Sequence, residues 1–497
     1  MTSDTTSRGQ PLLSRRLLLA GLAASLASPA LANAPAHSPR PQARPGAAPL
    51  AARAAAPAAP AMPASAEGLI EAARLGGRVT YAVYDARSGA LLEGRDPNVG
   101  QPPASVAKAV TSAFALERLG AGYRFTTRLV ATGPIQGGVL NGDLVLMGGG
   151  DPRLSTDDLG DMVAALRAKG LRQVRGRFLV NGSALPSIPR IDAAQPEHLG
   201  YNPAISGINL NFNRVHMEWK RGKQGWQIGM DARADRYAPS VAMASARIIE
   251  RQRPLFTYDQ GNGSERWTVA SASLGKGGSR WMPIRQPEAY AGDVFRALCL
   301  SQGIEVPPPA TTNTQPQGSV IAQTSSPVLS DVLRDMLKHS TNLTAEVMGL
   351  TSSGQGSLRN SAGMMNDWLR SRHGIEAGFV DHSGLGGASR ISAAAMAGVL
   401  MRTPNLSQIM RAHPVAEKGQ GPQVHAKTGT LNFVSGLAGY VQTARPLVFA
   451  IFAADTARRD SLSPAEMERP RGGPEWNRRA RNLQNELIKR WSTVYTS

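Results

Sequence analysis

The sequence predicts an α+β protein in which an antiparallel sheet flanked by helices is interrupted by a long β-rich insertion. The first observation is that residues 67–125 carry the pattern of a helix, a hairpin and a second helix. The second is that strand and helix patterns return in residues 318–497, whereas residues 126–317 are short β-like runs separated by Gly, Asn and Pro. We therefore expect 67–125 and 318–497 to form one discontinuous domain into which 126–317 is inserted.

The first segment begins with EGLIEAARL at 67–75, which is typical of a short helix. RVTYAVYD at 78–85 predicts a strand, and the turn ARSG leads into a second strand near Leu91. Pro103 is a helix start signal, and apolar residues then recur at helical spacing as far as Leu119. The segment is therefore expected to form a compact unit of a hairpin followed by a helix.

The inserted region has a different texture. TTRLVATG, GDLVLMGG, GRFLVNGS and VHMEWKRG are short runs typical of strands. DDLGDMVAALRAKG at 157–170 gives the clearest helical pattern of this region. We expect two subdomains here, one formed by 126–207 with 296–317 and the other by 208–295.

The last segment supplies the rest of the expected sheet and its helices. Helical patterning returns at 329–340 and at 392–401. Residues 424–441 and 446–454 predict neighbouring strands, the first of these runs being divided by a Gly/Ser/Asn-containing turn. A long helix at 474–491 is expected to close the chain.

Residues 1–32 have the organisation of an export signal. Arg15 and Arg16 precede the apolar run LLLAGLAASLA, and the small-residue pattern Ala-Leu-Ala follows, ending at Ala32. The apolar run is too short to span a bilayer comfortably, so we expect no transmembrane anchor after cleavage. The paired arginines fit the twin-arginine route, which predicts a periplasmic protein. Residues 33–66 read as a Pro/Ala-rich linker.

The chain is strongly basic, with a formal net charge of +19. Nucleic acid is the obvious partner for such a charge, but the export signal and the lack of a nucleic-acid-binding motif predict no such partner. An anionic polymer of the cell envelope suits the charge better, with scattered solvated arginines as the alternative. The single cysteine, Cys299, has apolar neighbours and predicts a small core residue. No metal-ligand motif is present, so we expect neither a metal nor a cofactor.

Ser105 and Lys108 form a Ser-x-x-Lys motif at the start of the second expected helix. Residues three apart lie on one helix face with Cβ atoms roughly 5–6 Å apart. A neutral lysine could accept the serine proton if burial and a nearby cation lowered its pKa from about 10.4. The alternative is a solvated surface lysine. A second Ser-x-x-Lys, Ser273 to Lys276, is followed by Gly-Gly and lacks the helical context.

Two further short motifs occur later in the chain. The only Ser-x-Asn runs from Ser340 to Asn342, at the end of an expected helix. Its hydroxyl could relay a proton, and its amide could donate to a substrate carbonyl. The only Lys-Thr-Gly runs from Lys427 to Gly429, at the end of an expected strand. Lys427 would be the second cation, and Gly429 would let a substrate backbone lie flat against the strand edge.

These three motifs occur in the order typical of penicillin-interactive serine enzymes. The long interval between the first two resembles the D-alanyl-D-alanine carboxypeptidase/endopeptidase family of the penicillin-binding protein 4 type, low-molecular-mass class C DD-peptidases. GGGDPRLSTDDL, GINLNFNRV and DHSGLGGASRIS are further matches. The resemblance covers residues 70–497 and implies a penicillin-binding/β-lactamase-like transpeptidase domain with the insertion between the first two motifs.

The resemblance implies a role for each motif. Ser105 would attack the carbonyl of the penultimate D-Ala and form an acyl-enzyme, with Lys108 as general base. Ser340 would be a further catalytic residue in proton relay, and Asn342 would position the substrate. The middle residue, Thr341, departs from the Asp or Asn usual in the family, and we expect it to face outward.

The resemblance also assigns substrate-binding residues. Lys427 and Thr428 would bind the terminal carboxylate, and Gly429 would belong to the same binding strand. The oxyanion hole would be the backbone N–H groups of Ser105 and Thr430. Arg390 is the candidate for the family's substrate-contacting arginine, although DHSGLGGASR is longer than the compact Ser-Gly-Leu-Ser-Arg of the family.

The function implied is serine-type D-Ala-D-Ala carboxypeptidase or DD-endopeptidase activity on peptidoglycan stem peptides and cross-links. β-Lactam antibiotics would be covalent inhibitors that acylate the serine. A β-lactamase or esterase on the same catalytic domain is one alternative, and a non-catalytic cell-wall-binding protein is another. The balance between carboxypeptidase and endopeptidase activity stays open.

Overall fold

A computed structural model describes residues 64–415, 421–463, 466–468 and 470–495. The expected export signal at 1–32 and the expected linker up to residue 63 lie outside the described residues. In the described ranges, no helix combines the length and the apolar character needed to cross a membrane.

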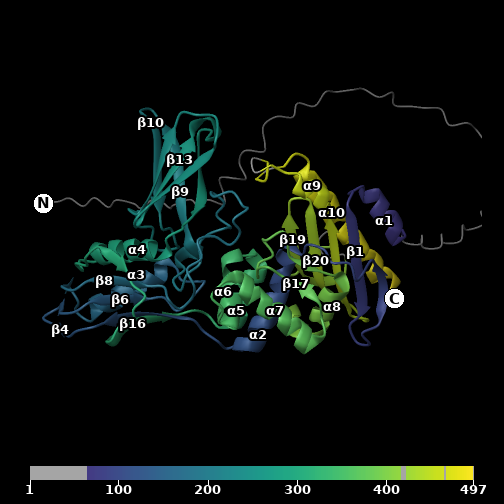
Figure 1. Ribbon diagram of the computed structural model, residues 1–497, viewed down its shortest axis with the longest axis horizontal. Helices are drawn as coiled ribbons and strands as arrows, with labels where there is room; N and C mark the ends of the chain where they lie inside the picture. Colours follow the sequence, from purple (N-terminus) through teal and green to yellow (C-terminus); the bar gives the residue numbers. More distant parts are fainter. Residues whose placement is uncertain (1–63, 416–420, 464–465, 469, 496–497) are drawn as a thin grey trace, which may run out of the picture. The chain divides into compact units, whose positions relative to one another are not determined.

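Strands from the two ends of the chain form one sheet. Its order is β19-β20-β21-β1-β2, and every neighbouring pair is antiparallel. The strands are β1 (Arg78–Asp85), β2 (Leu91–Arg95), β19 (Gln423–Leu431), β20 (Val434–Gln442) and β21 (Leu447–Ala454). β1 pairs with β21 along its whole length, which joins the first segment to the last (Figure 1).

Helices cover both faces of this sheet because its side chains alternate between two apolar cores. One face packs against α1 (Ala66–Ala73) and α10 (Gly473–Val494). On the other face α8 packs on the sheet, and α5, α6 and α7 gather around α2 (Figure 1). These helices are α2 (Ala107–Leu119), α5 (Leu329–His339), α6 (Asn342–Ser353), α7 (Leu358–His373) and α8 (Ala393–Arg402). Short elements complete this part: η1 (Ala104–Val106), β17 (Ala377–Gly378), β18 (Arg390–Ile391), η4 (Pro404–Gln408) and α9 (Thr456–Asp460).

The region between α2 and α5 has its own sheets and its own apolar core. The largest sheet has the order β15-β8-β6-β3-β16 and packs against two helices. These elements are β3 (Thr126–Ala131), β6 (Leu144–Met147), β8 (Phe178–Asn181), β15 (Pro309–Thr311), β16 (Ser319–Ser325), α3 (Thr156–Ala168) and α4 (Pro287–Ser301). Cys299 lies fully buried in this core, as predicted.

Three smaller sheets complete the region, with the orders β10-β9-β14, β11-β13-β12 and β4-β5-β7. Their strands are β4 (Ile135–Gln136), β5 (Val139–Leu140), β7 (Gln173–Val174), β9 (Arg214–Gly222), β10 (Gly225–Asp231), β11 (Ala244–Ile249), β12 (Phe256–Gly261), β13 (Ser264–Ala270) and β14 (Gly277–Pro283). Two short turns, η2 (Leu210–Asn213) and η3 (Ser271–Ser273), lie between them. The second Ser-x-x-Lys therefore begins on a short 3₁₀ turn and lies on no α-helix.

Two expected boundaries differ from the structure. β16 pairs with β3 along Thr126–Ala131, so the inserted sheet extends through Ser325 rather than ending at residue 317. α4 runs unbroken through the expected subdomain boundary at 295/296. In both cases one apolar core is shared across the expected boundary. Domain boundaries predicted from composition miss a shared core of this kind, because strand pairs such as β3 and β16 join residues far apart in the sequence.

The expected helices and strands of the first and last segments are confirmed, but α4, α6 and α7 were not predicted. Almost every residue of α6 is buried, so its sequence shows no alternation between an apolar and a polar face. α7 is largely polar, with a narrow apolar stripe. α4 lies in a stretch whose neighbouring sequence is dominated by short β-like runs.

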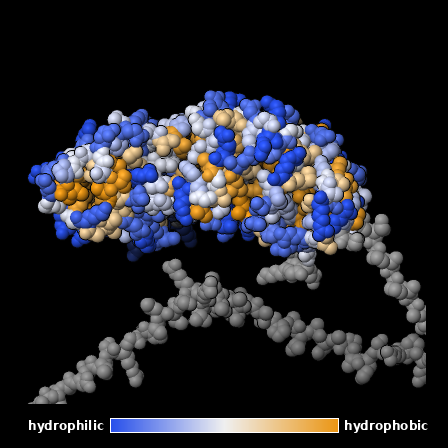
Figure 2. Space-filling model, turned by 90° about the horizontal axis from the view of Figure 1, so that it is seen from below, coloured by the Kyte–Doolittle hydropathy of each residue, from blue (hydrophilic) through white to orange (hydrophobic). Residues whose placement is uncertain are grey.

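The apolar side chains lie mainly inside these cores. Hydrophilic residues cover most of the face in Figure 2, and hydrophobic residues form separate patches on it. The large apolar side chains that are exposed among the described residues are scattered along the chain: Leu91, Tyr201, Ile249, Leu255, Leu300, Val320 and Val494.

The packing of α10 on the sheet predicts the effect of one core truncation. Leu487 is fully buried, and Leu487→Ala should lower the free energy of unfolding by about 2–5 kcal/mol because it leaves a cavity. Arg481→Ala, on the exposed side of the same helix, should change it by less than about 0.5 kcal/mol. Chemical denaturation followed by tryptophan fluorescence, to which the buried Trp476 and Trp491 of α10 contribute, measures both. Equal effects would contradict this packing.

Candidate active site

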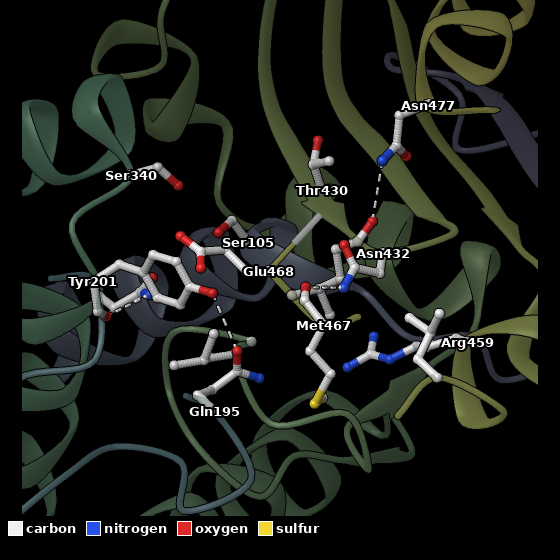
Figure 3. Close-up of a pocket in the computed structure, with 15 residues that line it drawn as sticks. Ser105, Gln195, Tyr201, Ser340, Thr430, Asn432, Arg459, Met467, Glu468 and Asn477 are labelled. Carbon is white, nitrogen blue, oxygen red and sulfur yellow. Dashed lines mark hydrogen bonds between the residues drawn. The ribbon is translucent and has the colours of Figure 1, made fainter. Parts of the chain in front are cut away.

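Ser105 lies on η1, the short 3₁₀ turn that leads into α2. The residue before it, Ala104, has the left-handed conformation with φ +47° and is fully buried. A left-handed residue that carries a Cβ costs roughly 1–2 kcal/mol, so the surrounding packing must hold this turn. The turn presents the Ser105 hydroxyl at the edge of a cavity (Figure 3).

Strand β19 runs directly beside this turn, and Gly429 is the point of closest approach. A Cβ at this position would lie 2.5 Å from the carbonyl oxygen of Pro103 and 3.0 Å from the backbone nitrogen of Ser105. The structure thus gives Gly429 a second role beside the predicted approach of a substrate backbone to the edge of β19, which stays a prediction. The glycine is required because the serine turn packs against it.

Lys108 is fully buried, one helical turn from Ser105, as predicted. Its Nζ lies 3.0 Å from Ser105 Oγ, 2.8 Å from Asn342 Oδ1 and 2.8 Å from the carbonyl oxygen of Ser383. Burial lowers the pKa of Lys108 to about 8, while the nearby carboxylates of Glu346 and Asp381 act in the opposite direction. Burial, rather than a second cation, is what lowers this pKa.

Ser340 and Lys427 form a second pair at the same cavity. Ser340 ends α5 in the left-handed conformation, with φ 58°. Lys427 is 2% exposed, and its Nζ donates to Ser340 Oγ at 3.0 Å and to the carbonyl oxygen of Thr428 at 2.7 Å. Burial, and then the positive charge of Lys108, lower the pKa of Lys427 well below its ordinary value.

A cavity of about 290 Å³ brings these groups together (Figure 3). Ser105, Ser340, Asn342 and Thr430 line it, so four of the predicted residues share one space. Lys108 and Lys427 lie beneath it and reach it through the two serine hydroxyls. Thr428 and Gly429 do not line the cavity.

Arg390 does not reach this cavity. Its guanidinium donates to the carbonyl oxygens of Gly387 and Ser389, and its side chain lines a separate cavity next to β17. The arginine that lines the Ser105 cavity is Arg459, from α9. The three extra residues of DHSGLGGASR relative to Ser-Gly-Leu-Ser-Arg lengthen the segment before Arg390.

Several cavity residues were not predicted. Gln195 and Tyr201 come from the inserted region, and Glu468 from the segment before α10. The Tyr201 hydroxyl donates to Gln195 Oε1 at 3.2 Å, and Asn342 Nδ2 donates to the Tyr201 carbonyl oxygen at 3.0 Å. All three lie on irregular segments without a recognisable motif. Within the described ranges, no cluster of His, Cys, Asp and Glu side chains could hold a metal ion.

The chain matches the model of the D-Ala-D-Ala carboxypeptidase 3 (S13) family over residues 64–468. It belongs to this family. The chain is 29% identical over 427 residues to the D-alanyl-D-alanine carboxypeptidase of Actinomadura sp. (strain R39). The alignment covers 76% of this chain and 77% of the relative. The crystal structure of penicillin binding protein 4 (dacB) from Haemophilus influenzae has a TM-score of 0.69 at 21% identity, covering 86% of this chain and 100% of that one. The same protein complexed with a novel β-lactam has a TM-score of 0.66 at 21% identity, covering 85% of this chain and 99% of that one.

These findings confirm the family that the three motifs indicated and the α+β fold of the penicillin-binding protein 4 type. This S13 chain is a serine-type D-Ala-D-Ala carboxypeptidase.

The close approach of β19 to the serine turn predicts that this S13 enzyme tolerates no side chain at position 429. Gly429→Ala should lower kcat/KM for D-Ala release roughly 100-fold, because an ångström-scale shift of the serine turn is enough for a loss of that size. Gly363→Ala in α7 is the matched control, since its Cβ would meet nothing within 4 Å. A folded Gly429→Ala enzyme with wild-type kcat/KM would contradict the prediction.

Proposed function

We propose that Ser105 is the nucleophile of the peptidase and that Lys108 is its general base. The observation that carries this proposal is the surroundings of the Lys108 amine. Two of its three polar neighbours, Asn342 Oδ1 and the Ser383 carbonyl oxygen, can only accept hydrogen bonds. A neutral amine therefore gives its two N–H groups to them and turns its lone pair toward the Ser105 hydroxyl. This is the arrangement that a serine needs in order to lose its proton.

The first half of the reaction follows from this assignment. Ser105 Oγ bonds to the carbonyl carbon of the penultimate D-Ala while its proton passes to Lys108 Nζ. The backbone N–H groups of Ser105 and Thr430 are proposed to stabilise the oxyanion, since both residues line the cavity. The peptide C–N bond then breaks, and the departing D-Ala nitrogen takes a proton from Ser340, which Lys427 Nζ replaces. Water then adds to the acyl carbon and gives a proton through Ser340 to Lys427, while Lys108 returns its proton to Ser105 Oγ as the ester bond breaks.

Substrate binding is proposed to use the second pair. Lys427 and Thr428 would attract the terminal carboxylate of the peptide, and Asn342 would donate to a substrate carbonyl. Arg390 is omitted from this proposal because its guanidinium lies in a separate cavity. Arg459 is the arginine on the wall of the Ser105 cavity, and its positive charge suits an anionic peptide.

We extend the proposal to inhibitors, location and domains. β-Lactams are proposed to acylate Ser105, which is consistent with the β-lactam complex of the Haemophilus influenzae protein of this fold. The sequence of residues 1–32 supports export to the periplasm, with the twin-arginine route suggested by Arg15 and Arg16. We further propose that the catalytic domain is discontinuous and resumes after β16.

Penicillin labelling tests the nucleophile directly. The mature wild-type protein should form a covalent adduct with a fluorescent penicillin, and peptide mass mapping should place it on the peptide that carries Ser105. Ser105→Ala should give no adduct and no D-Ala release from muropeptides. An adduct on another residue, or labelling that survives in folded Ser105→Ala, would refute the assignment.

Product analysis with the same protein should distinguish carboxypeptidase activity from endopeptidase activity. Release of free D-Ala from stem pentapeptides marks carboxypeptidase activity, and conversion of cross-linked dimers to monomers marks endopeptidase activity. Both must disappear in Ser105→Ala if one acyl-enzyme serves both. Turnover of penicillin faster than its accumulation on Ser105 would favour the β-lactamase alternative.

Acylation should also depend on pH. Only neutral Lys108 accepts a proton, so the acylation rate constant should rise with pH, with a midpoint near the pKa of about 8 that burial gives this lysine. Rapid-quench measurements with the fluorescent penicillin between about pH 6 and pH 9 check this, with thermal unfolding at each pH as the control for folding. A flat profile over this range would contradict the role of Lys108.

A further inference from the structure

Two carboxyl groups are buried beneath Lys108 and have no place in the reaction steps above. Glu346 is 0% exposed and Asp381 is 3% exposed. Burying a carboxylate costs several kcal/mol unless hydrogen bonds or charges compensate it. An acidic pair at this depth therefore needs a physical reason.

All four oxygens of the pair accept hydrogen bonds from one loop. The two oxygens of Glu346 accept from the backbone nitrogens of His382 at 3.0 Å and Ser383 at 2.8 Å. Those of Asp381 accept from the backbone nitrogens of Gly384 at 2.9 Å and Gly386 at 2.5 Å. The pair thus fixes the backbone of residues 382–386.

This loop carries one of the three groups that hold the catalytic amine. The carbonyl oxygen of Ser383 lies 2.8 Å from Lys108 Nζ, and the nitrogen of the same residue donates to Glu346. Asn342, which supplies the second acceptor for Lys108, stands one helical turn before Glu346 on α6. One helix therefore sets both acceptors, Asn342 directly and Ser383 through Glu346.

The loop is also tied to the nucleophile turn. Gly384 has φ +73°, and a Cβ on it would lie 1.8 Å from the carbonyl oxygen of Ala104. Thr111 of α2 donates to the carbonyl oxygen of His382 at 2.7 Å. A displacement of the loop would therefore move the surroundings of Ser105 and Lys108 together.

We infer that Glu346 is a positioning residue for the reaction: it fixes the Ser383 carbonyl against Lys108 so that the amine lone pair is left for Ser105. Asp381 completes this anchor by holding the glycine side of the loop. The inference rests on the proposed roles of Ser105 and Lys108. Glu346 touches neither substrate nor the reacting atoms, and it acts through the Ser383 peptide group.

The pair has an electrostatic effect as well. Burial raises the pKa of Glu346, as does the neighbouring Asp381, and burial raises the pKa of Asp381. The other titratable groups facing this centre are Lys108, Lys427, His382 and Asp192. Burial lowers the pKa of His382 to about 3, so it carries no charge at neutral pH. The carboxylates therefore limit how far burial lowers the pKa of Lys108.

Two substitutions separate position from charge. Glu346→Gln keeps the shape but turns an amide N–H toward a backbone N–H of the loop, so one anchor is lost. Glu346→Asp keeps the charge but is one methylene too short to reach both nitrogens. If position matters, both variants should acylate with fluorescent penicillin roughly 100-fold more slowly than wild type. Glu346→Gln should also shift the rising limb of the pH profile to lower pH, because a negative charge near Lys108 is removed.

The matched control is Ser361→Ala. Ser361 Oγ is hydrogen-bonded to His382 Nε2 at 2.7 Å, so this variant loosens the same loop without removing an acceptor from the Ser383 nitrogen. It should lower the melting temperature but leave acylation within a few-fold of wild type, with its pH profile unmoved. Equal losses in Ser361→Ala and Glu346→Gln, or wild-type acylation by Glu346→Gln, would overturn the inference.

A second variant and the mapping of wild-type adducts complete the test. If Glu346→Gln does not fold, Asp381→Asn removes an acceptor from the other side of the loop and should also slow acylation, and a wild-type rate would again overturn the inference. Wild-type adducts are mapped in parallel. A wild-type adduct away from Ser105 refutes the proposed function, whereas an adduct on Ser105 with unaffected Glu346 variants refutes only the role of Glu346.

Discussion

The buried amine of Lys108 is the constraint on which the rest of the site depends. A lysine with no exposed surface must find acceptors for its N–H groups inside the protein, and it finds them on Asn342 and on the Ser383 carbonyl. The positions of α6 and of the loop after Asp381 therefore satisfy two needs: the buried amine needs hydrogen-bond acceptors, and the reaction needs that amine beside Ser105. Burial, which would be a pure cost elsewhere, here brings the pKa of Lys108 to about 8, where the amine can act as a base.

Backbone strain accompanies this burial. Ala104 and Ser340 both adopt the left-handed conformation although neither is a glycine. Ala104 directly precedes Ser105, and Ser105 and Ser340 line the same cavity. Gly384 and Gly429 stand where the Ala104 and Pro103 carbonyl oxygens approach most closely. The glycines let the loop and β19 pack tightly enough to hold the serine turn in its costly conformation. The position of the catalytic serine, the strain in its turn and the placement of the two glycines therefore all depend on the same packing contacts.

The sequence was sufficient to predict those features that depend on interactions between residues close together in the chain. Ser105 and Lys108 lie on one face because of helical spacing. The antiparallel pair β19 and β20 follows from two β-like runs joined by a short turn that contains Asn432. Glu346 could not be predicted, since α6 is buried almost all round and shows no periodicity. Arg390, at the start of β18, lines a separate cavity, whereas Arg459 from α9 lines the Ser105 cavity. Motif spacing could not show this, because the course of the segment before Arg390 decides where its side chain lies. The contributions of Gln195 and Tyr201 depend on long-range packing of the inserted region.

The two buried lysines differ in what controls their protons. The pKa of Lys108 reflects burial opposed by two carboxylates, whereas that of Lys427 reflects burial reinforced by the charge of Lys108. In the proposed mechanism, the proton that Ser105 gives to Lys108 therefore makes Lys427 a weaker base at that moment. A weakened Lys427 releases a proton to Ser340 more readily, and Ser340 is the hydroxyl from which the departing amine takes one. The carboxylates beneath Lys108 thus oppose the effect of burial on Lys108, whereas at Lys427 a neighbouring positive charge reinforces it.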